Sequence, residues 1–109
     1  MDMNTMQTCI DACNACATAC DNCAAMCLKE EHVGAMARCI ALDMDCAQLC
    51  RLAAGVMARG SEHAGQVCQL CAAVCRACAQ ECGKHQMDHC QACARACAEC
   101  AAACEKMAA

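Results

Sequence analysis

The sequence contains no phenylalanine, tyrosine, tryptophan or proline. Leucine, isoleucine and valine together supply only 11 of its 109 residues, a content that normally argues against a packed core. The chain has no aromatic side chain to stack on a base, no basic run and a formal net charge of −4. It therefore lacks the means by which proteins usually bind nucleic acid, and we expect no nucleic-acid partner.

Long hydrophobic stretches are also missing. No run of about 18 apolar residues is present, and the first residues do not combine a cationic start with an apolar segment. We therefore expect a cytoplasmic protein with no membrane partner. A length of 109 residues suits one domain, so residues 1–109 are expected to form a single compact unit.

What the sequence does contain is 19 cysteines and 9 methionines. A protonated cysteine behaves as a small apolar residue, so cysteines can take the place of the missing branched side chains in a core. Disulfides rarely persist in a reducing cytosol, and an odd number of cysteines cannot pair completely within one chain. Free thiols or metal thiolates are therefore expected.

The cysteines recur almost entirely at steps of three and four residues within each cluster. This spacing keeps side chains on one face of a helix, whereas a strand needs a step of two. The pattern CxxCxxxCxxCxxxC occurs three times, at residues 13–27, 68–82 and 90–104, so one helical unit is repeated. The candidate metal ligands are Cys9, Cys13, Cys16, Cys20, Cys23, Cys27, Cys39, Cys46, Cys50, Cys68, Cys71, Cys75, Cys78, Cys82, Cys90, Cys93, Cys97, Cys100 and Cys104.

The breaks between the cysteine clusters predict four helices, at residues 5–29, 33–59, 62–83 and 86–107. Gly60 suits a helix end and Ser61 an N-cap, and Gly83 suits the end of the third helix. Connections this short make neighbouring helices antiparallel. We therefore predict an all-α fold, an antiparallel up-down-up-down four-helix bundle with cysteines lining the core.

The choice of metal follows from ligand softness and from charge. Thiolates select copper(I), zinc or iron–sulfur clusters, and the eight CxxxC pairs place two sulfurs about one helical turn apart, which suits two-coordinate copper(I). Cys39, Cys68 and Cys90 remain to bridge between helices. One copper(I) per thiolate leaves the core near neutral, whereas a four-thiolate zinc site keeps a charge of about −2. We predict storage of many copper(I) ions without catalysis, in a bundle that folds before metal binds.

Other interpretations stay open. A general thiolate buffer for zinc or cadmium, as in metallothionein, is the main alternative. An iron–sulfur electron carrier is disfavoured because the usual bacterial ligand run ends in cysteine–proline, and this chain has no proline. A thiol oxidoreductase is disfavoured because the CxxC pairs recur inside helices, with no strand-rich fold around them.

The two ends of the predicted bundle differ in chemistry. Met6, Met57 and Met107 continue the cysteine seams at one end. The other end gathers neutral ligands, namely His32, Met36, His85, Met87 and His89. Thioether and imidazole can pass copper(I) inward without trapping it, so this end is the candidate mouth. Taken singly, each of these residues is also explained as a space-filling methionine or a solvated loop histidine.

Two further features of the second predicted helix matter. Asp43 stands where a cysteine is expected, and it is either an inward ligand or proton acceptor, or it faces the surface or hydrogen-bonds a neighbouring helix. A second apolar stripe, which continues on the third helix, favours contacts between subunits. The stripe consists of Leu42, Leu49, Leu52, Val56, Val67, Leu70 and Val74.

Through CxxxC pairs on every predicted helix, the sequence resembles the cytosolic copper storage proteins, a bacterial family of cysteine-rich four-helix bundles. The likeness spans nearly the whole chain, and the departure is Asp43. The resemblance implies a homotetramer that binds many copper(I) ions per chain through the inward cysteines, reached from the end that bears histidine and methionine. A copper chaperone is the candidate donor of the ion, and metal homeostasis is the expected role.

Overall fold

The computed structural model describes residues 2–108, which form four α-helices and one short 3-10 helix. The elements are α1 (Met3–Cys27), η1 (Val33–Met36), α2 (Ala37–Ala58), α3 (Ala64–Gly83) and α4 (Asp88–Ala108). Residues 2–108 contain no strand, and none of their helices combines the length and apolarity that a membrane span requires. The prediction of an all-α fold is confirmed.

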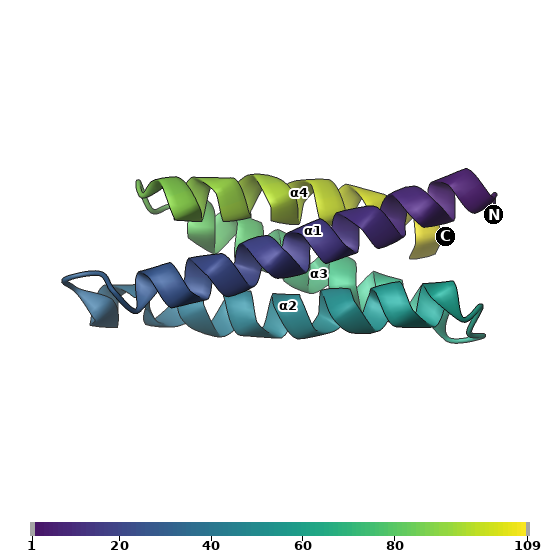
Figure 1. Cartoon of the computed structure of the whole chain (residues 1–109), viewed down its shortest axis with the longest axis horizontal. Helices are drawn as coiled ribbons and strands as arrows, with labels where there is room; N and C mark the ends of the chain where they lie inside the picture. The colour runs from purple at the N-terminus through teal and green to yellow at the C-terminus, as the bar shows by residue number, and fades with distance from the viewer. Residues whose placement is uncertain (1, 109) are drawn as a thin grey trace.

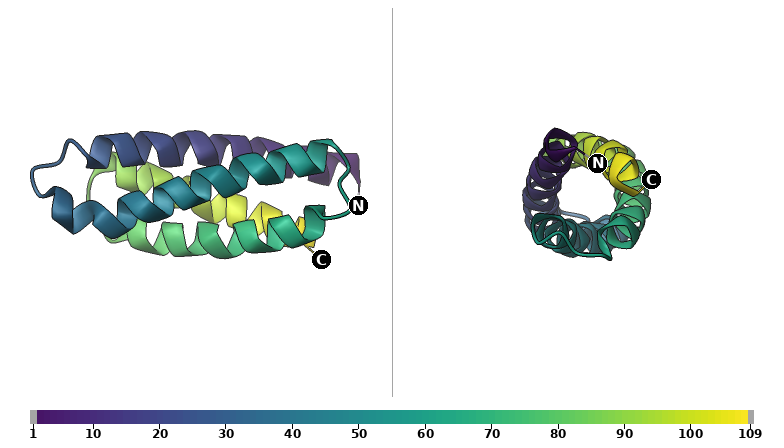
Figure 2. Two further views of the ribbon diagram at one scale, coloured as in Figure 1. Left: turned by 90° about the horizontal axis from the view of Figure 1, so that it is seen from below. Right: turned by 90° about the vertical axis from the view of Figure 1, so that its right-hand side faces the viewer.

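Each helix packs against two neighbours, because α1 contacts α2 and α4, and α3 contacts the same two helices. Consecutive helices run in opposite directions (Figure 1), as short connections require. The four helices surround a common axis (Figure 2), and the molecule measures 45 × 17 × 17 Å. The predicted up-down-up-down bundle is therefore confirmed.

The two ends of the bundle are built from different segments. Both chain termini lie at one end (Figure 1), together with the connection at residues 59–63, and we call this the terminal end. The opposite end is formed by the connections at residues 28–36 and 84–87 and by the first turn of α4. It carries His32, His85 and His89, and we call it the histidine end.

Sulfur fills the core. All 19 cysteines have 0% exposure, so the seams predicted from the three-and-four spacing face the bundle axis. Small side chains such as those of Ala17, Ala47, Ala53 and Ala101 are buried beside them and let the helices approach closely. A core of small side chains explains how a chain without aromatic residues packs into a narrow bundle.

The first helix begins two residues earlier than predicted, because the sequence places an effective cap outside the cysteine pattern. The Asp2 carboxylate accepts a hydrogen bond from the Thr5 backbone N–H at 2.7 Å, so α1 starts at Met3 rather than at residue 5. The helix ends at Cys27, two residues before the predicted end. Its last cysteine is therefore also its last helical residue.

The second helix also begins at a different residue. Residues 33–36 form η1, in which the Ala35 N–H bonds back three residues to the His32 carbonyl at 3.0 Å. The first four residues of the predicted helix are therefore 3-10 rather than α-helical, and the α-helix begins at Ala37. The tighter 3-10 turn carries the chain from α1 to α2 across the histidine end.

Gly60 ends α2 as predicted, but Ser61 does not cap α3. Gly60 has a φ of 66°, and the Ser61 N–H bonds the Val56 carbonyl at 2.9 Å, which is a Schellman ending that glycine adopts without steric cost. The Ser61 hydroxyl accepts a hydrogen bond from the His63 N–H at 3.1 Å, within a turn. The helix α3 therefore begins at Ala64 instead of residue 62.

The last connection is fixed by a side chain of α4. The Gln91 amide donates hydrogen bonds to the Gly83 carbonyl at 3.2 Å and to the His85 carbonyl at 2.7 Å. These bonds hold residues 84–87 outside the helix, so α4 begins at Asp88 rather than at residue 86. Asp88 in the first turn also complements the positive end of the helix dipole.

Metal-free reduced protein should already be folded, because neutral thiols pack as apolar groups and the helices are rich in alanine. Far-ultraviolet circular dichroism of chelator-treated, reduced protein is expected to show a helical spectrum and a cooperative thermal transition. A random-coil spectrum that becomes helical only when metal is added would contradict this account and would match a metallothionein-like protein.

Candidate metal site

Cysteines four residues apart on one helix bring their sulfurs together. In seven of the CxxxC pairs the Sγ–Sγ distance lies between 3.8 and 4.0 Å. The eighth pair, Cys9 and Cys13, is joined through Cys104, whose Sγ lies 3.7 Å from each. A soft cation between two such sulfurs is therefore within reach of both.

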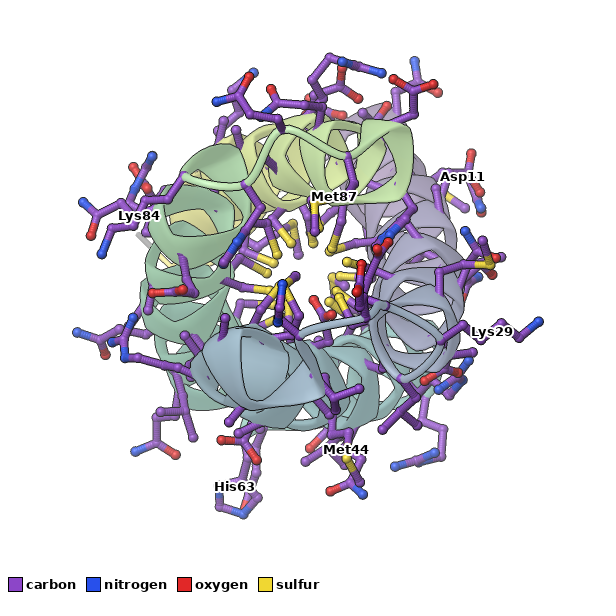
Figure 3. All side chains as sticks on the ribbon, turned by 90° about the vertical axis from the view of Figure 1, so that its left-hand side faces the viewer. Asp11, Lys29, Met44, His63, Lys84 and Met87 are labelled. Atoms are coloured by element: carbon purple, nitrogen blue, oxygen red, sulfur yellow. The ribbon has the colours of Figure 1, made fainter. Side chains whose placement is uncertain are left out.

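Sulfurs of different helices lie equally close. Cys39 of α2 lies 3.3 Å from Cys82 of α3, and Cys90 of α4 lies 3.8 Å from Cys23 of α1. Cys68, the third cysteine outside the CxxxC pairs, is fully buried near the start of α3, at the terminal end. Figure 3 shows the sulfur atoms gathered around the bundle axis, inside the ring of helices. We call this set of 19 cysteines the thiol column.

Within the thiol column, several groups of four sulfurs lie within 4.8 Å of one another. Neighbouring groups share cysteines, so ions bound in them would be bridged by common sulfurs. Four sulfurs at this spacing also suit tetrahedral zinc, so distances alone do not select the metal. The groups include Cys13/Cys71/Cys100/Cys104, Cys16/Cys46/Cys50/Cys75, Cys16/Cys20/Cys46/Cys97, Cys20/Cys78/Cys93/Cys97 and Cys23/Cys27/Cys39/Cys90.

Asp43 points into the thiol column rather than to the surface. Its side chain is fully buried, and its Oδ1 accepts hydrogen bonds from the thiols of Cys78 and Cys93, both at 3.2 Å, and of Cys82 at 3.4 Å. Burial raises the pKa of Asp43 to about 7, because a carboxylate removed from water loses its hydration. Of the alternatives that the sequence left open, the structure shows the inward orientation together with hydrogen bonds to the neighbouring helices α3 and α4, and it excludes the surface orientation.

Burial also raises the pKa of several cysteine thiols. Removal from water raises the pKa of Cys68 and of Cys90 to about 11, and it raises the pKa of Cys39. These thiols are therefore protonated at neutral pH in the metal-free protein. A metal ion that binds them must displace a proton from each sulfur that it takes.

A cavity of about 330 Å³ opens at the histidine end. Its lining includes four of the five residues predicted for a mouth, namely His32, Met36, His85 and Met87. Met36 is buried, while His32 is exposed. Figure 3 looks onto this end and shows Met87 directed toward the bundle axis.

His89, the fifth predicted residue, lies between the connections and the outermost thiols. Its Nδ1 lies 3.5 Å from the Cys90 Sγ and 4.0 Å from the Cys27 Sγ. Its Nε2 lies 3.1 Å from the Glu30 Oε1, and its side chain is 10% exposed. The ring thus joins a carboxylate of the connecting loop to two sulfurs of the thiol column.

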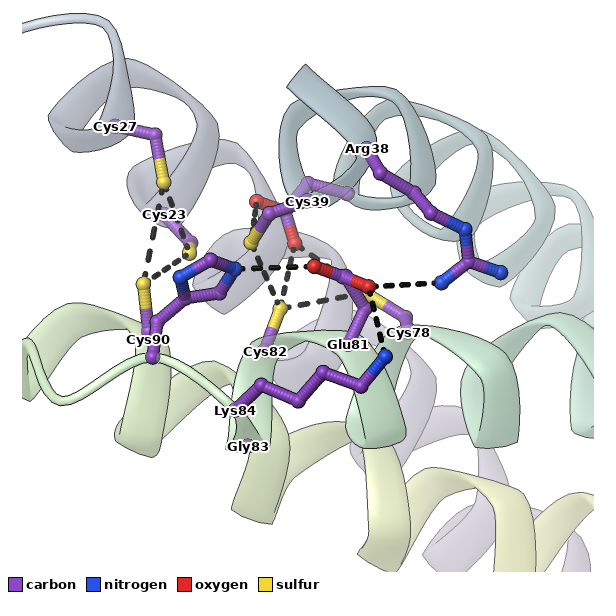
Figure 4. A network of polar contacts seen from close by, with 12 residues as sticks. Cys23, Cys27, Arg38, Cys39, Cys78, Glu81, Cys82, Gly83, Lys84 and Cys90 are labelled. Carbon is purple, nitrogen blue, oxygen red and sulfur yellow. Dashed lines mark hydrogen bonds and ion pairs between the residues drawn. The ribbon is translucent and has the colours of Figure 1, made fainter. Parts of the chain in front are cut away.

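Sequence reasoning did not single out Glu81 or Glu30. The Glu81 carboxylate lies 2.9 Å from the Arg38 Nη1, 3.5 Å from the Lys84 Nζ and 3.0 Å from the His85 Nε2 (Figure 4). The hydrogen bonds of Arg38 and His85 hold the pKa of Glu81 below its ordinary value. The i,i+4 spacing of Glu81 and His85 is a signal that reveals this pair.

The contact between Glu30 and His89 has no such local signal, because the two residues are 59 positions apart. It depends on how the loop after α1 folds over the start of α4.

The family of the chain is established by comparison of its sequence with known protein families. The profile of a protein family described as copper storage protein matches residues 2–109. The chain belongs to the copper storage protein family. The resemblance drawn from the CxxxC pairs is thereby confirmed.

Solved structures of copper storage proteins are similar over almost the whole chain. The Cu(I)-bound copper storage protein BsCsp3 is 47% identical, with a TM-score of 0.92 and coverage of 96% of this chain and 99% of that chain. A cytosolic copper storage protein from Streptomyces lividans, described with five coppers, is 40% identical, with a TM-score of 0.93 and coverage of 96% of this chain and 92% of that chain.

A relative is also found by sequence alone. The uncharacterized cysteine-rich protein YhjQ of Bacillus subtilis (strain 168) is 48% identical over 83 residues, which are 76% of this chain and 77% of that protein.

In this copper storage protein the terminal end differs from the histidine end. Met57 is 1% exposed, and Met6 and Met107 are half-buried against the core. His63 is exposed at this end and pairs with the neighbouring Glu62. Methionine side chains thus cover the thiol column at the terminal end.

Replacement of Asp43 by asparagine should change how stability depends on pH. The pKa of Asp43 is about 7 in the folded protein and 3.8 ordinarily, so the folded state holds the proton more tightly. Its contribution to stability is full below about pH 4 and is lost as pH rises through about 7, by an amount on the order of 4 kcal/mol. Urea unfolding of metal-free, reduced protein at pH 4.5 and 7.5 measures the change.

Asp43→Asn should lack this loss, and its stability should fall less between the two pH values than that of the unchanged protein. The substitution also alters hydrogen bonds, which changes the free energy of unfolding by the same amount at both pH values. Such a constant difference does not affect the comparison of how the free energy of unfolding depends on pH. Parallel pH dependences would contradict the assignment of the buried, titrating carboxyl to Asp43.

Proposed function

We propose that this protein stores copper(I) by binding many ions to the thiolates of the thiol column. The observation that carries the proposal is that all 19 cysteine side chains are buried around one axis. Each Cu⁺ forms a Cu–S bond, and the displaced thiol proton goes to solvent. All 19 cysteines act as ligands in this proposal, which implies a capacity of about one ion per thiolate.

The descriptions of related copper storage proteins support copper(I) as the stored ion. BsCsp3 is described as Cu(I)-bound. The Streptomyces lividans protein is described with five coppers in one structure and as loaded with 10 copper equivalents in another. A store that takes up several ions in succession matches a column of groups that share sulfurs.

Charge favours copper(I) over zinc in the column. One copper(I) per thiolate leaves the column neutral, whereas each four-thiolate zinc site keeps a charge of about −2. The buried charged residues within residues 2–108 are Asp43 and Glu81, and both are acidic. No buried cation of that region offsets the negative charge that zinc filling would accumulate, and such charge is costly in a dry core.

Copper enters, in this proposal, at the histidine end. His32, Met36, His85, Met87 and His89 supply neutral nitrogen and sulfur donors that hold the ion briefly and release it to thiolates. Support comes from the cavity that four of them line and from the contacts of His89 with Cys27 and Cys90. Asp43 accepts hydrogen bonds from the thiols farther in and serves as an auxiliary ligand or proton acceptor.

The proposal extends to the protein's context. Residues 1–109 act as one storage domain in the cytosol, receive copper from a chaperone and catalyse no reaction. The description of the Streptomyces lividans relative as cytosolic supports the location. Leu52 and Leu70 are 48% and 54% exposed on α2 and α3, which supports assembly of several chains, and the resemblance to the family favours a tetramer.

Titration of the reduced protein with copper(I), in anaerobic competition with a chromophoric chelator, tests the storage function. More than eight ions per chain should bind, because shared sulfurs raise the capacity above that of the eight CxxxC pairs. A parallel titration with zinc should saturate at fewer ions. Saturation with only one or two copper ions per chain would refute storage.

Two matched variants on α4 test whether the copper(I) capacity depends on the cysteines of the thiol column. Cys97→Ala removes a sulfur that belongs to at least two of the four-sulfur groups and should lower the copper capacity by at least about one ion. Ala98→Ser alters the exposed neighbour and should leave the capacity unchanged. Equal capacities of the two variants would contradict a role for Cys97 as a ligand.

A further inference from the structure

Two of the three histidines at the histidine end, His85 and His89, are held by carboxylates in the same way. The His89 Nε2 lies 3.1 Å from the Glu30 Oε1, and the His85 Nε2 lies 3.0 Å from the Glu81 Oε2. In each pair the remaining ring nitrogen, Nδ1, is not used by the carboxylate. Their side chains are only 10% and 17% exposed, so these contacts are partly shielded from water.

The Glu30 contact selects one form of the His89 ring. A carboxylate accepts hydrogen bonds but cannot donate them, so the bond at 3.1 Å requires a proton on Nε2. In the neutral ring, Nδ1 then carries a lone pair. A lone pair on nitrogen is what a metal ion needs, and a carboxylate behind a ligating histidine commonly fixes its orientation and tautomer.

The free nitrogen faces the thiol column. The His89 Nδ1 lies 3.5 Å from the Cys90 Sγ and 4.0 Å from the Cys27 Sγ. Both cysteines belong to a four-sulfur group with Cys23 and Cys39. Without Glu30, the opposite tautomer becomes available, in which an Nδ1–H donates to the Cys90 sulfur and the lone pair points away from the column.

From this geometry we infer that Glu30 is a positioning residue for copper uptake, which holds His89 with its Nδ1 lone pair directed at Cys27 and Cys90. The inference rests on the proposed storage function and concerns the rate of loading rather than the capacity. Copper(I) on Nδ1 passes to a thiolate by exchange of one ligand, and the thiol proton goes to solvent. Glu30 stays bound to the Nε2 proton throughout.

Glu30 offers a cleaner test than Glu81. Glu81 also contacts Arg38 and Lys84, so its removal alters the packing between α2 and α3. Glu30 lies on the loop after α1, and its side chain is 33% exposed. Glu31, one residue along, carries the same charge, is exposed and lines the same cavity, but within the range 2–108 its side chain forms no hydrogen bond or ion pair, so it tests the effect of charge at the mouth alone. Glu31→Ala is therefore the matched control for Glu30→Ala.

The first readout is the ring tautomer of metal-free protein. Long-range ¹H–¹⁵N correlation spectra at neutral pH distinguish a protonated from an unprotonated ring nitrogen, and a His89→Gln variant identifies the His89 signals. The unchanged protein and Glu31→Ala should show the proton of His89 on Nε2. Glu30→Ala should show a mixture of both tautomers, and so should Glu30→Gln, because its amide can donate to Nε2 as well as accept from an Nε2–H.

The second readout is the rate of copper(I) loading in stopped-flow mixing with a weak copper(I) complex. Glu30→Ala should load about tenfold more slowly than the unchanged protein and reach the same final stoichiometry. Glu31→Ala should load at the unchanged rate. Equal slowing by both substitutions would show a general charge effect and overturn the inference, as would an unaltered tautomer in Glu30→Ala.

Failure of the storage function is recognised separately, because the unchanged protein would then bind only one or two copper ions whatever the state of His89.

Discussion

The structure depends on keeping a buried column of sulfur electrically neutral. All 19 cysteines are fully buried, and burial raises the pKa of thiols such as Cys68 and Cys90 to about 11. Protonated thiols such as these act as small apolar groups and fill the core of a chain that has almost no other candidates. In the copper loading that we propose, each lost proton is replaced by one monovalent cation. The same side chains then fill the core in both states.

Much of the fold was predictable because one periodicity carries both the fold and the site. The three-and-four spacing of cysteines identifies a helix and also the face that turns inward, so the bundle and the thiol column follow from the same residues. Helix ends were less predictable, because they depend on single contacts outside that pattern. The Asp2 cap and the Gln91 bonds to loop carbonyls each move a helix start by two residues.

Some contacts at the histidine end could not be predicted from the sequence. Histidine and methionine at predicted helix ends indicate a mouth, and the cavity there is lined by four of these residues. Of the two carboxylates that contact His85 and His89, Glu81 has a local i,i+4 signal, whereas Glu30 meets His89 only because the loop after α1 folds over the start of α4. The contacts of Asp43 were also not predictable in full. Its place in the cysteine pattern predicts the helix face on which it lies, but not the three thiols that donate hydrogen bonds to its Oδ1.

Neutrality of the filled column is most directly tested by counting the protons released as copper binds. Weakly buffered, reduced protein at pH 7 is titrated anaerobically with a copper(I)–acetonitrile complex while a pH indicator follows the released acid. Over the full loading, the account predicts about one proton per copper, because each ion replaces one thiol proton. Release of about two protons per copper would mean a negatively charged core, and loading without proton release would mean that the buried thiols were ionised beforehand; either result would contradict the account.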